Sequence, residues 1–178
     1  MIYKLVKEGS KVLHNPTEEF DFENPQIDPV ELFENLKETL IANLGVGLSA
    51  PQCGLPYSVF VVGHHADPDN IFPVFNPKIV DTEGVVNEEE GCLTFPGLFI
   101  SIKRPAIIRA RYTTHLEVTD TIKFGGFTAR AFQHEYDHLQ GKLFMSRAGA
   151  VALSRGRDQK KKLDRLRRNR QSLTTFLR

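Results

Sequence analysis

The decisive stretch of this sequence reads Gln133-His134-Glu135-Tyr136-Asp137-His138-Leu139-Gln140-Gly141. It lies in a helix that we predict from about Thr128 to Gln140, with Gly141 as its stop. Residues four apart share one face of a helix, so the imidazoles of His134 and His138 can bind the same metal ion. Glu135 lies on the same turn, where it can reach a metal-bound water. The pattern predicts a catalytic metal centre, although two surface histidines would also produce it.

The sequence after the motif contains no evident third protein ligand for such a centre. A catalytic metal site generally has three protein ligands and one open position. No histidine follows His138, and the only later acids are Asp158 and Asp164 in a basic segment. The ligand must therefore come from upstream, where Cys92 is the best candidate. A lone cysteine is more often a small buried apolar residue, but the neighbouring Gly91 lets the backbone approach a ligand closely, so both interpretations stay open.

The composition indicates a soluble, globular chain with a basic end. The 178 residues are 40% hydrophobic and 25% charged, and no apolar run approaches the ~20 residues that span a bilayer. Two cysteines define no disulfide framework and the first residues show no targeting signal, so we expect a cytoplasmic protein. Residues 155–178 hold ten Lys/Arg and two Asp/Glu, a balance of +8, against −7 for the preceding residues. Such tails often contact nucleic acid or another polyanion.

An earlier helix is predicted to begin at Asp28. Asp28 can cap it, Pro29 suits the first helical position, and Gly45 is suited to end it. The apolar residues at helical spacing should form one buried stripe. These are Val30, Phe33, Leu36, Leu40 and Leu44.

Short apolar and β-branched runs predict strands between the two helices. Phe72–Val80 contains Pro73 and Pro77, which limit it to an edge strand or two fragments. Gly125-Gly126 is predicted to form a turn before the motif helix. The other predicted strands are Ser58–Val62, followed by an antiparallel meander of Phe99–Ile102, Ala106–Tyr112 and Leu116–Phe124.

Three motifs together resemble the peptide deformylase family, which carries G-h-G-h-A-A-P-Q, E-G-C-L-S and Q-H-E-x-D-H-L-x-G, where h is apolar. This chain has, in the same order, Gly45-Val46-Gly47-Leu48-Ser49-Ala50-Pro51-Gln52, Glu90-Gly91-Cys92-Leu93-Thr94 and residues 133–141. The resemblance extends from about Leu13 to Phe144 and departs from the motifs at Ser49 and Thr94. It implies an α+β fold with antiparallel sheets around a central metal-binding HExxH helix, and an additional C-terminal helix.

By this resemblance, Cys92, His134 and His138 bind one divalent metal ion. Fe²⁺ is favoured in cells, and Ni²⁺, Co²⁺ or Zn²⁺ can replace it. The resemblance makes Glu135 the acid/base that acts on water, with the Gln52 side-chain amide and the Leu93 backbone N–H as oxyanion donors. The implied reaction removes the formyl group from the N-terminal methionine of new proteins and releases formate.

The resemblance also implies how a formylmethionyl peptide binds. An extended peptide would pair with backbone groups near Val46, Gly47 and Leu93. A methionine pocket needs apolar walls, for which Phe127 and Ala131 are candidates, although ordinary core packing accounts for these two equally well. Later residues of the peptide are expected to matter little, because backbone pairing does not read sequence.

We expect a catalytic domain over residues 1–150 and a basic helical tail over residues 151–178. In some bacterial members of the family a basic C-terminal helix docks on the ribosome, and residues 160–168 resemble such a segment. Docking would be largely electrostatic, while a solvated tail is an equally good interpretation. We expect a monomer that does not bind membranes.

Two other functions agree with part of the sequence. A generic zinc peptidase would use His134, Glu135 and His138 with a different third ligand, and a Cys92→Ala protein that keeps its metal would favour it. A ribosome- or RNA-binding protein without activity would account for the basic tail but not for the intact motifs.

Two acidic residues near the motifs suggest a supporting structure. We hypothesise that Glu90 pairs with an arginine such as Arg104 and braces the Cys92 loop. Asp137 can orient its neighbours, but a solvated helix face is an equally good interpretation.

Overall fold

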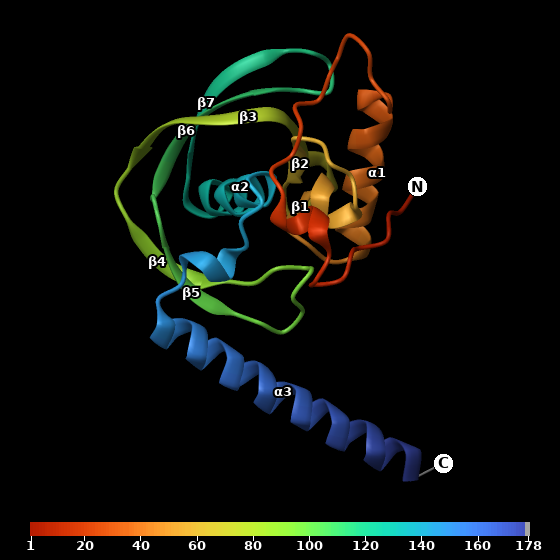
Figure 1. The fold of residues 1–178 in the computed structure, drawn as a ribbon, viewed down its shortest axis with the longest axis vertical. Coiled ribbons are helices and arrows are strands. Elements are labelled where there is room, and N and C mark those ends of the chain that lie inside the picture. The colour runs from red at the N-terminus through yellow and green to blue at the C-terminus, as the bar shows by residue number, and fades with distance from the viewer. Residues whose placement is uncertain (177–178) are drawn as a thin grey trace.

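The chain forms an α+β fold with antiparallel sheets, as the sequence predicts (Figure 1). The computed structural model describes residues 1–176, with side chains through Arg168. The described helices are α1 (Pro29–Ala42), α2 (Gly126–Leu139) and α3 (Ala150–Phe176), and none is long and apolar enough to cross a membrane. The strands are β1 (Gly47–Ser49), β2 (Val59–Val62), β3 (Phe72–Glu83), β4 (Val86–Glu90), β5 (Ile100–Arg104), β6 (Ile107–Thr113) and β7 (Thr119–Gly125).

Helix α1 begins where the sequence predicts but ends differently. The Asp28 carboxylate accepts hydrogen bonds from the backbone N–H groups of Val30 and Glu31, at 2.9 and 3.0 Å. At the other end Leu44 has a φ of 54°, so Leu44, and not Gly45, takes the left-handed conformation that ends the helix. Gly45 is instead needed for space, because a Cβ there would lie 2.8 Å from the Leu93 side chain.

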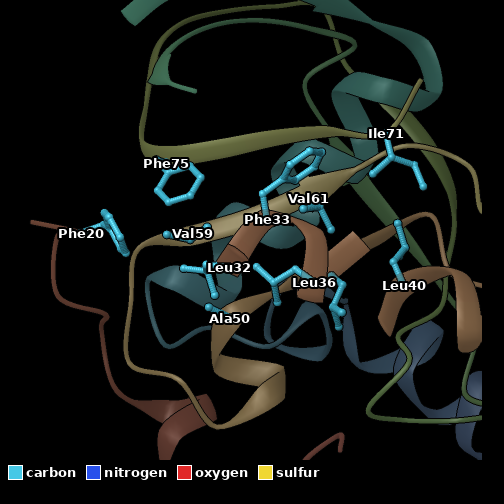
Figure 2. Packing of buried hydrophobic residues seen from close by; sticks show 11 residues of the cluster. Phe20, Leu32, Phe33, Leu36, Leu40, Ala50, Val59, Val61, Ile71 and Phe75 are labelled. Atoms are coloured by element: carbon cyan, nitrogen blue, oxygen red, sulfur yellow. The ribbon is translucent and has the colours of Figure 1, made fainter. Parts of the chain in front are cut away.

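The buried stripe of α1 is narrower than predicted. Val30 and Leu44 are exposed, while Leu32, which the spacing did not single out, is fully buried. The helix therefore presents a slightly rotated face to β1 and β2. Figure 2 shows this cluster, in which the α1 side chains meet residues of β2 and β3. It contains Phe20, Leu32, Phe33, Leu36, Leu40, Leu48, Ala50, Val59, Val61, Ile71 and Phe75.

Strand β3 corrects the prediction of an edge strand or two fragments. It is one strand inside a five-stranded sheet of order β1-β2-β3-β6-β7, and its first half pairs with β2 while its second half pairs with β6. Pro77 lies at a register shift between Phe75 and Lys78, where the ladder is interrupted. A bulge removes the need for the N–H that proline lacks, so the strand continues past it.

The second sheet consists of β4 and β5 and was predicted only in part. The sequence did not single out β4, and β5 pairs with β4 instead of joining β6 and β7 in a meander. The predicted turn at Gly125-Gly126 is also wrong. Gly125 ends β7 and caps α2, and Gly126 is the first residue of the helix. The predicted stop at Gly141 agrees with its φ of 66°.

Helix α2 packs against β1, β2, β6 and β7. Its Ala129 and Phe132 enter a second apolar cluster with Phe60, Val74 and Ile108. Yet α2 also buries polar side chains, which cost free energy unless they are paired. These are Arg130, Gln133, His134, Glu135, Asp137 and His138. A helix that buries so many polar groups indicates a site built on it.

Candidate metal centre and substrate cleft

The three candidate metal ligands come together at one point. Cys92 lies in the loop after β4, while His134 and His138 project from α2. One donor atom from each residue lies within 4.8 Å of the other two, and Cys92 Sγ is 3.4 Å from His138 Nε2. Three donors at this spacing can share a divalent ion at bond lengths of ~2.0–2.3 Å. The arrangement favours the ligand interpretation of Cys92.

Burial and neighbouring groups shift the pKa values of the two candidate histidine ligands in opposite directions. Burial lowers the pKa of His138 well below its ordinary value, so this imidazole is neutral. Burial acts in the same direction on His134, but the Cys92 sulfur and the Glu90 carboxylate outweigh it and raise the pKa of His134 to about 10. Because Glu90 Oε2 lies 3.1 Å from His134 Nδ1, the other ring nitrogen is left to face Cys92. A metal ion would take the place of a proton between the Cys92 sulfur and this imidazole.

Glu135 follows His134 on α2, and one of its two carboxylate oxygens is not hydrogen-bonded to the described protein. Its Oε2 atom is buried and has no hydrogen-bond partner among the described residues. Burial raises the pKa of Glu135 to about 7, although His134 opposes the shift. The other oxygen occupies the space that a side chain at Gly47 would need, since a Cβ there would lie 2.5 Å from Glu135 Oε1. The carboxylate can therefore exchange a proton with a small molecule near neutral pH.

The Gln52 side chain is held in one orientation next to the Cys92 sulfur. Its oxygen accepts hydrogen bonds from the backbone N–H and the hydroxyl of Ser49, both at 2.9 Å. Its amide nitrogen is then left to donate, and it lies 3.2 Å from Thr94 Oγ1 and 3.4 Å from Cys92 Sγ. The two residues that depart from the family motifs, Ser49 and Thr94, thus both contact Gln52.

A buried charge network connects His134 and its neighbour Asp137 on α2 to Glu90, which ends β4 just before the Cys92 loop. Arg104 Nε and Nη2 donate to the two oxygens of Glu90 at 2.5 and 2.8 Å, which confirms the predicted pair. Arg104 Nη1 donates to Asp137 Oδ2 at 2.8 Å, and Arg147 also donates to Asp137. Arg130 Nη1 donates to Glu90 Oε1 at 2.7 Å. Asp137 is therefore buried and paired, which excludes the solvated helix face.

Sequence reasoning missed two members of this network. Arg130 and Arg147 come from α2 and from the 3₁₀ turn Phe144–Arg147, and neither lies in a position that periodicity marks. Arg130 is one helical turn from His134, so a basic residue on the ligand-bearing face was the available signal.

A cleft of about 510 Å³ opens above the candidate metal centre. Residues that line it include Cys92, His134 and Glu135, so the donors face the space where a ligand would lie. The five residues predicted to bind substrate also line it: Val46, Gly47, Leu93, Phe127 and Ala131. Phe127 is 57% exposed, which argues against simple core packing for this residue. Ala131 is buried and also packs in the second apolar cluster.

A cysteine sulfur and two imidazoles, a buried carboxylate and an apolar cleft together define a candidate metal-dependent hydrolase. A family model described as polypeptide deformylase matches residues 2–153. The chain belongs to the polypeptide deformylase family, whose members depend on a metal ion. It is accordingly a hydrolase that removes the N-formyl group from nascent polypeptides.

Curated relatives agree with this assignment. The peptide deformylase of Cytophaga hutchinsonii is 37% identical over 159 residues, which cover 85% of this chain and 84% of the relative. Peptide deformylase 1 of Bacillus cereus is 36% identical over 146 residues, covering 82% and 92%.

Solved structures agree as well. A peptide deformylase from Synechococcus elongatus in complex with actinonin superposes with a TM-score of 0.82 at 29% identity, covering 89% of this chain and 88% of that one. The enzyme from Thermus thermophilus gives a TM-score of 0.80 at 32% identity, with coverage of 90% and 96%.

Proposed function

We propose that Cys92, His134 and His138 bind one divalent metal ion, Fe²⁺ in the cell, which Ni²⁺, Co²⁺ or Zn²⁺ can replace. One thiolate and two neutral imidazoles suit all four ions. When bound, the ion polarises a carbonyl oxygen and makes water more nucleophilic near neutral pH. Helix α2, which contributes two of the ligands, is then the central element around which the sheets build the site.

Glu135 is the acid/base in this proposal. As a water oxygen bonds to the formyl carbon, the carboxylate takes a proton from that water. It then gives the proton to the amine nitrogen while the carbon–nitrogen bond breaks, so that formate and a free methionine amine leave. The unpaired Oε2 atom and the pKa of about 7 support this role.

Gln52 and Leu93 stabilise the oxyanion that develops on the formyl oxygen. The Gln52 amide nitrogen already points toward Cys92 because Ser49 holds the amide oxygen. Leu93 directly follows the proposed ligand Cys92 and lines the cleft, which supports its backbone N–H as the second donor.

The peptide binds in extended form along Val46, Gly47 and Leu93, and the methionine side chain enters the apolar part of the cleft near Phe127 and Ala131. Val46 and Gly47 lie where β1 begins, and Leu93 lies in the loop after β4, so backbone groups of both segments are available to pair with an extended chain. One of the solved relatives, from Acinetobacter baumannii, is described as bound to Met-Ala-Ser.

The observation that carries the proposal is the convergence of Cys92, His134 and His138 beside a cleft that Cys92, His134 and Glu135 line. We would test it by measuring formate release from formyl-Met-Ala-Ser with protein prepared anaerobically with Fe²⁺ or Ni²⁺. A matched Glu135→Gln protein should bind the same amount of metal and lose nearly all activity. Equal activity of the two proteins would contradict the acid/base role, and a metal-loaded, folded protein without any activity would contradict the site.

The basic part of α3 is proposed to dock on the ribosome, with a catalytic domain over residues 1–150 and a basic tail over residues 151–178, of which residues 177–178 lie outside the described part of the chain. Exposed arginines at 165, 167 and 168 support an electrostatic contact with a polyanion. Reversing these three charges to Glu should abolish salt-sensitive co-sedimentation with ribosomes, and unchanged co-sedimentation would exclude docking. We further propose a monomer in the bacterial cytoplasm, encoded by a bacterium or a phage, with an organellar enzyme as the alternative.

A further inference from the structure

One wall of the cleft is an irregular segment from Phe95 to Phe99. Its backbone bonds are short turn bonds, from Phe95 N–H to the Cys92 carbonyl at 3.0 Å and from Leu98 N–H to the Phe95 carbonyl at 3.1 Å. These bonds shape the segment without tying it to either sheet. Its position therefore depends on side-chain packing, in which Phe95 and Leu98 meet Ile100, Ile102 and Phe144 on one side and the beginning of α3 on the other.

The beginning of α3 packs there through a buried glycine. A Cβ at Gly156 would lie 2.5 Å from the carbonyl oxygen of Phe99 and 2.9 Å from the Ile100 side chain. Glycine in the interior of a helix lowers its stability. Its presence here is explained by the close approach of the α3 backbone to the end of the wall.

A lysine one turn further along α3 makes the second contact. Lys160 Nζ donates to the carbonyl oxygen of Pro96 at 2.8 Å, and the Lys160 side chain is 29% exposed. Ala152 and Leu153, on the same side of the helix, pack in a third apolar cluster with Phe95 and Leu98. Figure 1 shows α3 starting beside β5 and then running away from the body, so only its beginning can support the cleft.

We propose that Gly156 and Lys160 are positioning residues, through which α3 holds the Phe95–Phe99 wall and sets how tightly the enzyme binds the peptide that follows the formylated methionine. The inference rests on the proposed substrate cleft. It makes the beginning of α3 part of the substrate-binding machinery, whatever the rest of the helix contacts. It also makes binding of later peptide residues depend on this wall, in contrast to the expectation from backbone pairing alone.

The test compares Lys160→Met with Lys161→Met in the full-length, metal-loaded enzyme. Each substitution removes one positive charge and one weak ion pair of α3, because Lys160 lies 3.7 Å from Asp164 and Lys161 lies 3.8 Å from Asp158. Only Lys160 contacts the wall, since the Lys161 side chain is 80% exposed. KM and kcat would be measured with formyl-Met-Ala-Ser and with formylmethioninamide, which lacks the later residues.

We expect Lys160→Met to raise KM for formyl-Met-Ala-Ser about three- to tenfold, the effect of losing one partly exposed charged hydrogen bond. KM for formylmethioninamide, kcat for both substrates, metal content and all constants of Lys161→Met should stay unchanged. Gly156→Ala, which pushes directly on the wall, should show the same selective change. Equal changes for both substrates, or equal behaviour of Lys160→Met and Lys161→Met, would overturn the inference. Loss of the proposed function would look different, because the unmodified enzyme itself would then release no formate.

Discussion

Replacement of Arg104 by methionine would show whether the buried charge network supports the metal centre. The Arg104 side chain is 2% exposed and makes three hydrogen bonds of 2.5 to 2.8 Å, two to Glu90 and one to Asp137. Methionine keeps most of the volume but removes the cation between the two carboxylates. The variant therefore tests electrostatic support with little change in packing.

The contacts of Arg104 indicate how much stability and metal affinity the Arg104→Met protein should lose. Removing one partner of a buried ion pair typically costs about 3–5 kcal/mol. Arg130 and Arg147 remain as partners of Glu90 and Asp137, so we expect the lower end, about 3 kcal/mol. For a chain of 178 residues, this corresponds to a fall in Tm of about 6–12 °C. Because Glu90 also orients His134, metal affinity should fall about 10- to 100-fold.

Urea unfolding would report the stability, and competition with a chelator would report the metal affinity. Lys103→Met is the matched control, since Lys103 is an exposed neighbour on the same strand. Lys103→Met should change neither the free energy of unfolding nor the free energy of metal binding by more than about 0.5 kcal/mol. Unchanged stability together with unchanged metal affinity in Arg104→Met would refute the supporting role of the network.

Three further predictions concern single residues of the site. Burial alone would raise the pKa of Glu90, but hydrogen bonds from Arg104 and His134 lower it from 4.5 to about 2. The Glu90 carboxylate therefore adds stability that is fully present above pH 4.5 and is lost as the pH falls toward 2. Urea unfolding of metal-free protein should show a loss of roughly 2 kcal/mol between pH 6 and pH 3 that is missing in Glu90→Gln. Gly47→Ala should lower kcat at least about tenfold with metal content unchanged, because its Cβ displaces the Glu135 carboxylate, whereas Gly9→Ala, in open space, should have no effect. Cys92→Ala should lose its metal to a chelator that leaves Cys53→Ala loaded, and a metal-loaded Cys92→Ala protein would contradict the ligand assignment.

Local sequence signals predicted the elements that carry the chemistry. The four-residue spacing of His134 and His138 required a helix, and Asp28 with Pro29 marked the start of another. Both signals act within one or two helical turns, so neighbouring residues suffice to read them. The strand predictions were weaker, because Pro77 is tolerated in β3 only through a bulge that depends on pairing with β6.

The sequence by itself determined which side chains can act as metal donors, the carboxylate of Glu135 beside them, and the helix that carries His134, Glu135 and His138. Only the tertiary structure decided that Cys92 meets the histidines, that Arg130 and Arg147 complete the charge network, and that α3 supports the cleft. These features join residues that are between 10 and 64 positions apart in the sequence. Burial and pairing in three dimensions stabilise these contacts, and the spacing of residues along the chain does not reveal which residues will meet.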